Sequence, residues 1–490
     1  MRYRHDTDGT RLPIKLDTAT NGEFAPMPLA PVHRHANRAA LDAATANAKR
    51  LGLDRRSFLV SAAGAATTLL AMNAAHARNG PPGGRGGYYE LPAAAALEMP
   101  VARSALDGNE FIFDVQGHFV NPTGAWTRTL PPGARPLQMP KTQSCGPGKG
   151  PGQLDYLQCI GAEEFVKDVF LDSDTDLMVL SFVPSTRAGE PLTIEEAAAT
   201  ARIVEKMDGT HRLFIHGRVN PNQPGDLEGM DSLAATHKIA AWKTYTQWGP
   251  DGKGFFLDDD TGSAFIEKAR RTGVRNIAVH KGLPFGQRSY EHSTCVDVGR
   301  AAKRFPDVNF LIYHSGLVAE RKEGPYDPKR TDGVDALVTS LLENGIKPGS
   351  NVYAELGSTW RIAMRDPDNA AHILGKLCRY AGEDNVLWGT DSIWYGSPQD
   401  QIQAFRAFQI APALRDRHGY PEMTPALRAK IFGLNALKIY PVADDVLRKH
   451  LPRDRVSTTR AEYREHPDPS FITHGPKTRR EFLNLKAWAG

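Results

Sequence analysis

The sequence predicts an α/β protein built around a single (β/α)8, or TIM, barrel. Three observations lead to this fold class. From residue 110 to residue 391, eight short apolar or β-branched runs alternate with segments of helical periodicity, the pattern of repeated parallel βαβ units. The runs are nearly continuous in apolar residues, as expected of strands buried on both faces. No G-x-G-x-x-G motif follows the first run, so the main alternative, a doubly wound dinucleotide-binding sheet, lacks its usual support.

The barrel is expected to occupy residues 110–445. Helical spacing is clearest in three segments: 194–207, 262–273 and 369–382. The predicted strands are 111–115, 176–183, 212–219, 239–245, 276–282, 309–316, 352–356 and 385–391.

Two further segments belong to this domain or follow it. A Gly/Pro-rich loop at 121–160 comes after the first strand. Loops at the carboxyl ends of barrel strands build the active face, so this loop is expected to cap the site. An insertion without that role is the alternative. The polar, basic tail at 446–490 is expected to pack around the barrel exterior.

Residues 1–77 are interpreted as an N-terminal extension that ends in an export signal. Arg55 and Arg56 precede an Ala-rich apolar run that closes on Ala75-His76-Ala77. This order resembles a twin-arginine signal. The resemblance implies the twin-arginine translocation machinery as a partner and a periplasmic or secreted bacterial protein. An ordinary amphipathic helix is the alternative.

The rest of the N-terminal half adds two expectations. Residues 78–109 begin with the Gly/Pro-rich stretch RNGPPGGRGG and are expected to form a flexible linker. The apolar run before them is short for a membrane-spanning helix, so no stable membrane association is expected.

Charge and cysteine content narrow the class of protein. The 60 Lys and Arg residues nearly balance 56 Asp and Glu, and no basic patch is interleaved with aromatic residues, which argues against a nucleic-acid partner. The four cysteines form no C-x-x-C pair. Cys145 and Cys159 flank a Gly/Pro-rich loop, so they form either a disulfide in an exported protein or two buried thiols.

Polar side chains recur where the predicted strands end. Because the strand ends of a barrel converge on one mouth, these residues are expected to lie together. Imidazole and carboxylate groups suit zinc and similar divalent ions, so the pattern predicts a metal site. The residues are Asp114, Gln116 and His118 on the first strand, Lys243 on the fourth, His280 on the fifth, His314 on the sixth and Asp391 on the eighth.

This pattern resembles the amidohydrolase superfamily over roughly residues 110–440. The similarity is carried by D-x-Q-x-H on the first strand, PDVNFLIYHSG, NVYAELGS and GEDNVLWGTDS. The branch it resembles includes aminocarboxymuconate-semialdehyde decarboxylase. The resemblance implies that His118, His280 and Asp391 bind one divalent metal, zinc or else manganese or cobalt. It also implies that His314 polarises the substrate or moves protons, and that Asp391 accepts a proton. Members of this branch often dimerise, so a homodimer is a further expectation.

Gln116 departs from the family pattern, which has His or Glu at that position. Three interpretations stay open. Gln116 binds one metal weakly through its oxygen, or it orients water or substrate, or the metal is lost and the barrel is a small-ligand binding protein. A second metal is not expected without a histidine at 116.

Four residues are predicted to contact a small-molecule substrate. Lys243, Arg187 and Arg218 are suited to an anionic group, and Trp394 to an aromatic pocket wall; ion pairing and ordinary packing are their alternatives. The main functional expectation is a metal-dependent hydrolase of a cyclic ester, lactone or amide that uses metal-activated water. The alternatives are a non-hydrolytic decarboxylase of an aromatic or unsaturated acid and a metal-free binding protein.

Overall fold

The computed structural model describes residues 5–79, 86–128, 156–284, 290–440 and 442–489. Eight parallel strands follow one another in a single sheet, in the order β2 to β9. All eight predicted strands are present. They are β2 Phe113–Gly117, β3 Leu177–Leu180, β4 Leu213–Arg218, β5 Ile239–Tyr245, β6 Asn276–His280, β7 Asn309–Tyr313, β8 Val352–Glu355 and β9 Val386–Leu387.

The first and last strands meet, so the sheet nearly closes into a barrel. The amide of Val115 donates to the carbonyl of Trp388 at 3.0 Å, and the amide of Asp391 donates to the carbonyl of Gln116 at 2.9 Å. Gly117 also forms a parallel bridge with Ser392. These contacts confirm the predicted (β/α)8 barrel, and they bring the ends of β2 and β9 side by side.

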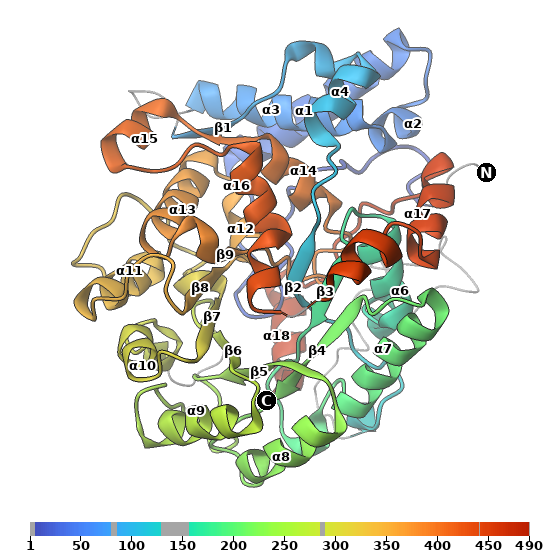
Figure 1. Ribbon diagram of the computed structural model, residues 1–490. Coiled ribbons are helices and arrows are strands. Elements are labelled where there is room, and N and C mark those ends of the chain that lie inside the picture. The colour runs from blue at the N-terminus through green and yellow to red at the C-terminus, as the bar shows by residue number, and fades with distance from the viewer. Residues whose placement is uncertain (1–4, 80–85, 129–155, 285–289, 441, 490) are drawn as a thin grey trace.

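Helices surround the barrel, as Figure 1 shows. The three helices expected from periodicity are α7 Ile194–Asp208, α9 Asp260–Thr272 and α13 Pro367–Tyr380. Each has a side-chain cap: Thr193, Asp259 and Asp366 accept from the backbone amide three residues later, which satisfies donors that the helix leaves free. The other helices of the barrel region are α5 Tyr156–Cys159, α6 Ala162–Val166, α8 Asp226–Thr236, α10 Val298–Arg304, α11 Gly333–Glu343, α12 Thr359–Ala363, α14 Gln399–Ala407, α15 Pro412–His418 and α16 Pro425–Ala429.

The N-terminal extension folds against the barrel. It forms α1 Pro31–Arg50, α2 Arg55–Val60 and α3 Ala62–Asn79, which lie together at one side of the molecule in Figure 1. The Ala-rich run that resembles an export signal is α3, and its Ala66, Leu69 and Met72 are fully buried in the main core cluster. No helix among the described residues is both long and apolar enough to span a membrane.

The paired arginines differ in their surroundings. Arg55 lies at the surface and donates to the carbonyl of Asp8. The side chain of Arg56 is buried, lies 3.9 Å from Asp6 and 3.8 Å from Asp468, and stacks over the ring of Phe471. Export by the twin-arginine route stays a prediction, and in the folded chain Arg56 is covered.

The expected linker is only partly irregular. Residues 80–85 lie outside the described residues. After them come β1 Gly87–Tyr89, which pairs with β10 Phe408–Ile410, and α4 Met99–Leu106. Tyr89, Ala102 and Leu106 are buried, so apolar burial orders a segment whose glycines and prolines suggested a linker. Most of the loop at 121–160, including Cys145, also lies outside the described residues; Cys159 is disulfide-bonded.

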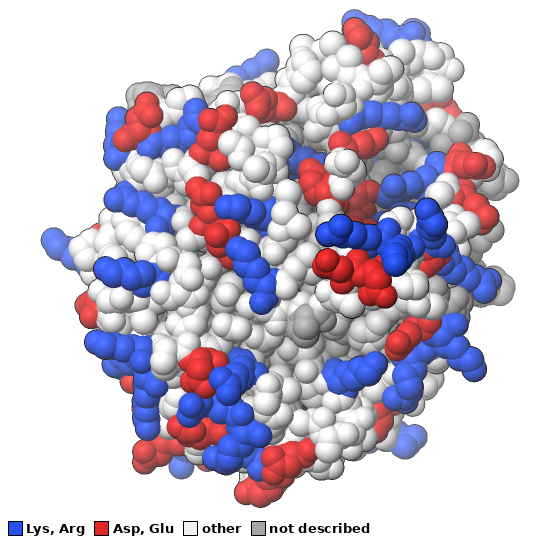
Figure 2. Space-filling model, in the orientation of Figure 1, with Lys and Arg blue, Asp and Glu red and all other residues white. Residues whose placement is uncertain are grey.

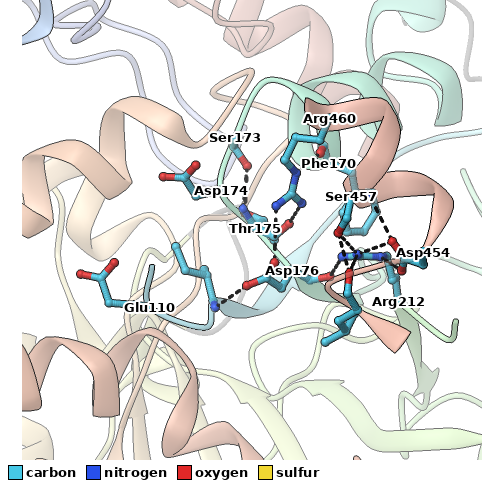
Figure 3. A network of polar contacts seen from close by, with 12 residues as sticks. Glu110, Phe170, Ser173, Asp174, Thr175, Asp176, Arg212, Asp454, Ser457 and Arg460 are labelled. Carbon is cyan, nitrogen blue, oxygen red and sulfur yellow. Dashed lines mark hydrogen bonds and ion pairs between the residues drawn. The ribbon is translucent and has the colours of Figure 1, made fainter. Parts of the chain in front are cut away.

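In the C-terminal tail, α18 Arg479–Ala489 lies against the N-terminal extension, with Leu485 beside Gly22, and α17 Arg455–Glu465 packs on α7. Figure 3 shows how one buried residue, Arg212, anchors it. The guanidinium of Arg212 binds both carboxylate oxygens of Asp454 at 2.6 and 2.7 Å, and it also donates to Ser457 and to the carbonyls of Asp176 and Leu451. Arg460 adds hydrogen bonds to the carbonyls of Phe170 and Thr175.

On the face of the molecule shown in Figure 2, basic and acidic side chains are interspersed, and neither sign forms a continuous field.

Candidate metal centre

Three of the predicted site residues stand at the ends of barrel strands. His280 is the last residue of β6, His314 follows β7, and Asp391 follows β9. His280 and His314 are fully buried, with ring centroids 4.6 Å apart. The structure therefore brings the predicted strand-end histidines together at one mouth.

The backbone at this mouth is unusual. His314, Ser358 and Asp391 have φ values of 66°, 53° and 58°, a left-handed region that non-glycine residues seldom adopt. Each such residue costs on the order of 1–3 kcal/mol and persists only where its surroundings impose it. Three of them at consecutive strand ends indicate that the backbone is held in this form to aim side chains at the mouth.

Glu355, at the end of β8, fixes this backbone. Its Oε2 accepts from the amide of His314 at 3.0 Å, and its Oε1 accepts from the amide of Gly357 at 2.6 Å. A side chain at position 389 would lie within 1.6 Å of Glu355 Oε1, so Gly389 leaves room for that carboxylate. Glu355 thus positions His314 through the backbone.

The sequence did not point to one member of the site. Glu23, in the N-terminal extension, lies with Oε1 3.4 Å from Nδ1 of His280 and Oε2 3.4 Å from Nε2 of His314. One ligand atom from each of Glu23, His280 and His314 lies within 4.8 Å of the others. No strand and no periodic pattern marks residue 23. The only hint in the sequence is the missing family ligand at position 116.

The other predicted ligands form an adjoining set. His118 Nε2 is 3.1 Å from Asp391 Oδ1, and the Gln116 amide nitrogen donates to that same oxygen at 3.2 Å. Asn21, beside Glu23 in the sequence, links the two sets: its amide donates to Asp391 Oδ2 at 2.6 Å and to Glu23. Ser358 also donates to Asp391 Oδ2 at 2.6 Å.

The residues of the site fit a divalent cation in three respects. The His314 Nδ1 atom lies 2.6 Å from the Gly357 carbonyl, so Nδ1 carries the proton and Nε2 presents its lone pair to the mouth. Burial lowers the pKa of His314 to about 4, and burial with the neighbouring His314 holds the pKa of His280 well below its ordinary value. Both imidazoles are therefore neutral, as metal ligands must be.

The third respect is charge. The charges that act on Lys243 are the carboxylates of Glu23, Glu355 and Asp391. These three acidic side chains gather around one buried lysine and His118, a surplus of acidic groups that favours a bound cation. Burial, followed by the charge of Asp391, raises the pKa of Glu23 well above its ordinary value, and a cation held at the mouth would favour the ionised form of this carboxylate.

Asp391 stays ionised in spite of its burial. Burial alone would raise the pKa of Asp391, but the hydrogen bond and the charge of His118 outweigh it and lower the pKa to about 2. Asp391 is therefore a carboxylate at neutral pH, and the His118–Asp391 pair can hold and release a proton beside the metal ligands.

The predicted substrate contacts divide into two groups. Lys243 is fully buried below the mouth, with its ammonium 3.9 Å from the ring centre of Tyr313, and it makes no hydrogen bond or ion pair within the part of the chain that the structure describes. Trp394 lines a small pocket with His118, Phe119 and Phe182. A substrate-binding role stays a prediction for both residues.

The two arginines are held elsewhere. Arg187 binds Asp226 at 2.9 Å and lies 3.5 Å from Glu190. Arg218 pairs with Glu190 and donates to the carbonyl of Ser185. Each guanidinium is thus engaged by internal acceptors, the ion-pairing alternative that the sequence left open.

Comparison with known proteins gives a family match. A protein-family model described as amidohydrolase matches residues 161–442, more than half of the chain. A comparison with curated proteins found no match.

Solved structures with a similar arrangement of strands and helices were also found. One is 5-carboxyvanillate decarboxylase from Novosphingobium aromaticivorans, complexed with manganese and 4-hydroxy-3-methoxy-5-nitrobenzoic acid (13% identity, 68% of this chain and 97% of that chain, TM-score 0.43). Another is 2,6-dihydroxybenzoate decarboxylase from Rhizobium (16% identity, 68% and 99%, TM-score 0.37). A third is an amidohydrolase from Mycobacterium avium subsp. paratuberculosis (14% identity, 69% and 99%, TM-score 0.40).

Proposed function

The chain belongs to the amidohydrolase family, and on this premise we propose that it is a metal-dependent decarboxylase of a small aromatic or unsaturated carboxylic acid. His280, His314 and Glu23 would hold one divalent ion, with zinc, manganese and cobalt as the candidates. Such an ion supplies Lewis acidity that polarises an oxygen of the substrate. The choice of reaction depends on this chain's own residues, because the named solved structures include both decarboxylases and an amidohydrolase.

One observation carries the proposal. His118, hydrogen-bonded to Asp391, lies in the wall of a pocket that is otherwise mostly apolar and aromatic. Flat aromatic walls favour a planar ring. His118 is the one titratable side chain among the pocket's lining residues, so a ring bound there would meet a proton source at its edge. The pocket is small as it stands, and a ring would need side chains such as Trp394 to move apart.

In decarboxylation, His118 and Asp391 would supply the proton, and the electron pair comes from the bond that breaks. The bond between the ring and the carboxylate breaks, and its electron pair stays on the ring carbon as carbon dioxide leaves. The His118–Asp391 pair delivers a proton to that carbon to form the new C–H bond, and solvent restores the proton. The buried walls of the site exclude water from the ring carbon until the pair has acted.

The test is a panel of hydroxylated benzoic acids incubated with protein loaded with manganese, zinc or cobalt. We expect stoichiometric carbon dioxide, and in deuterated water we expect one deuterium at the vacated ring carbon by mass spectrometry. Removal of the metal by chelation should abolish both signals, and its return should restore them. Absence of carbon dioxide with every acid and every metal would contradict the proposal.

A second candidate, hydrolysis of a lactone or cyclic amide, is favoured by one observation. The Asp391 carboxylate lies at the mouth, hydrogen-bonded to His118 and Ser358, in the position of a base that takes a proton from an attacking water molecule. A panel of lactones and cyclic amides, assayed by acid release in the same metal-loaded samples, separates the two. Acid release from a lactone or cyclic amide, without release of carbon dioxide, would establish hydrolysis.

Lys243 gives a further prediction. A buried ammonium without an ionic partner is suited to the carboxylate of a substrate. A charge-assisted hydrogen bond contributes roughly 1.5–3 kcal/mol, so Lys243→Met is expected to raise KM for the acid by roughly 10- to 100-fold. Lys238→Met, which removes an exposed lysine just before the same strand, is the matched control and should leave KM unchanged. An unchanged KM in Lys243→Met would show that this lysine only balances the neighbouring carboxylates.

A further inference from the structure

The N-terminal residues that reach the barrel mouth are built into the fold. Residues 12–27, here called the arm, bury Leu12, Ile14, Leu16 and Phe24 in the main core cluster. The arm thus shares the hydrophobic core of the barrel helices, although it precedes the barrel by some eighty residues of sequence.

Buried polar contacts fix the arm on both sides of Glu23. Lys15 pairs with Asp400 at 3.0 Å, with both side chains nearly inaccessible. Asp17 binds the buried guanidinium of Arg361 at 2.8 Å. The amide of Thr20 donates to the carbonyl of Pro476 at 3.0 Å. Displacing the arm would therefore break both of these ion pairs and would remove the donor from the carbonyl of Pro476.

The segment that carries Glu23 is a tight turn closed by its own side chains. The Glu23 amide donates to Asn21 Oδ1 at 2.9 Å, and the Gly22 amide donates to Thr20 Oγ1 at 3.0 Å. Gly22 has a φ of +90°, a conformation that favours glycine. This geometry holds the Glu23 carboxylate against His280 and His314, while the Asn21 amide binds Asp391.

The arm lies where the barrel lacks a ligand. Gln116 is uncharged, and its amide nitrogen is turned toward Asp391 and His118. Its oxygen has no hydrogen-bond partner among the described residues. An anionic oxygen at the mouth is supplied instead by Glu23, so the carboxylate missing from the strand comes from a distant part of the chain.

We propose that Glu23 is a resident metal ligand, and that the arm is a permanent part of the active site. This inference rests on the proposed metal-dependent function and adds the residue that replaces the absent strand ligand. Two neutral imidazoles with one carboxylate form a donor set of the kind used for catalytic metal ions. A removable plug is the competing role for the same carboxylate, but the buried ion pairs at Lys15 and Asp17 oppose its release.

This role makes the N-terminal extension necessary for the site. A chain cut after Ala77 would lose Glu23 and Asn21 together. The form that holds the metal is therefore the form that keeps residues 1–77.

The test measures metal binding without substrate, so a wrong assignment of the reaction does not affect it. Metal-free protein is titrated with Mn²⁺, and the free ion is followed by electron paramagnetic resonance. Loss of a group that only supports a ligand already weakens metal binding by roughly 10- to 100-fold, so Glu23→Gln should weaken it by about 100-fold or more. Glu98→Gln, the same change at an exposed N-terminal residue, should bind as the native protein does.

Two results would overturn the proposal. Binding of Mn²⁺ by Glu23→Gln within threefold of the native protein would exclude ligation. If that variant also turned substrate over faster, the arm would be an inhibitory plug. A second measurement avoids dependence on the variant's folding: anomalous diffraction from native crystals soaked in Mn²⁺ or Zn²⁺. We expect the ion at bonding distance from Glu23, His280 and His314, and an ion bound away from Glu23 would contradict ligation.

Discussion

Replacement of Asp391 by asparagine is expected to lower kcat by a factor of about 10²–10⁴, the usual contribution of a positioned acid or base. The carboxylate is hydrogen-bonded to His118, Ser358 and Asn21, and its depressed pKa keeps it charged at neutral pH. Asparagine keeps the shape of the side chain but can neither hold the proton nor stabilise a charged His118. Steady-state kinetics on metal-loaded protein measure the effect.

Two controls show whether a fall in kcat comes from the loss of proton transfer by Asp391. Asp384→Asn removes a half-exposed carboxylate that pairs with Lys430 and Lys438 at the surface, and it should leave kcat unchanged. The metal content of Asp391→Asn, measured by elemental analysis, separates loss of chemistry from loss of the ion. If Asp391→Asn kept its metal and its kcat within threefold of the native value, the proton-transfer role would be wrong.

The second large effect concerns stability. Arg212→Met is expected to lower the free energy of unfolding by about 3–5 kcal/mol, the cost of breaking a buried ion pair by removing one partner. Asp454 would remain buried without its partner, and the carbonyls of Asp176 and Leu451 would lose their donor. Because these groups join the tail to the barrel (Figure 3), the tail should also become more sensitive to protease.

Urea unfolding followed by circular dichroism measures the change. Arg448→Met removes a mostly exposed arginine from the same tail, and surface changes of this kind are usually within about 0.5 kcal/mol. Equal unfolding midpoints for Arg212→Met and Arg448→Met would show that the network does not anchor the tail.

The barrel could be predicted from sequence because its strands carry a strong local signal. Runs such as 309–316 are apolar, flanked by turns and separated by helical spacing, and each became a strand of the sheet. The strand-end residues His280, His314 and Asp391 could be found for the same reason, since closure of the sheet sets their positions. A local sequence pattern was therefore sufficient to predict residues whose spatial neighbours are set by the regular geometry of the barrel.

The residues that precede the barrel lacked such a signal. An Ala-rich apolar run such as residues 61–77 suits an export signal and a buried helix equally well, so composition alone does not distinguish them. Glu23 lies on an irregular segment between Gly22 and Phe24, and only long-range packing brings it to His280. Family pattern identified the gap at Gln116, but not the distant residue that faces it.

The contact between Thr20 and Pro476 has a consequence for how the protein is made. Residue 23 leaves the ribosome long before residue 476, whose carbonyl accepts from the amide of Thr20 at the start of the turn. Contacts between such distant positions form late in folding, because closing the intervening chain costs entropy first. Capture of the ion should therefore wait until residue 476 has been made, and a polypeptide stalled before that residue would have the barrel strands but would lack this contact beside Glu23.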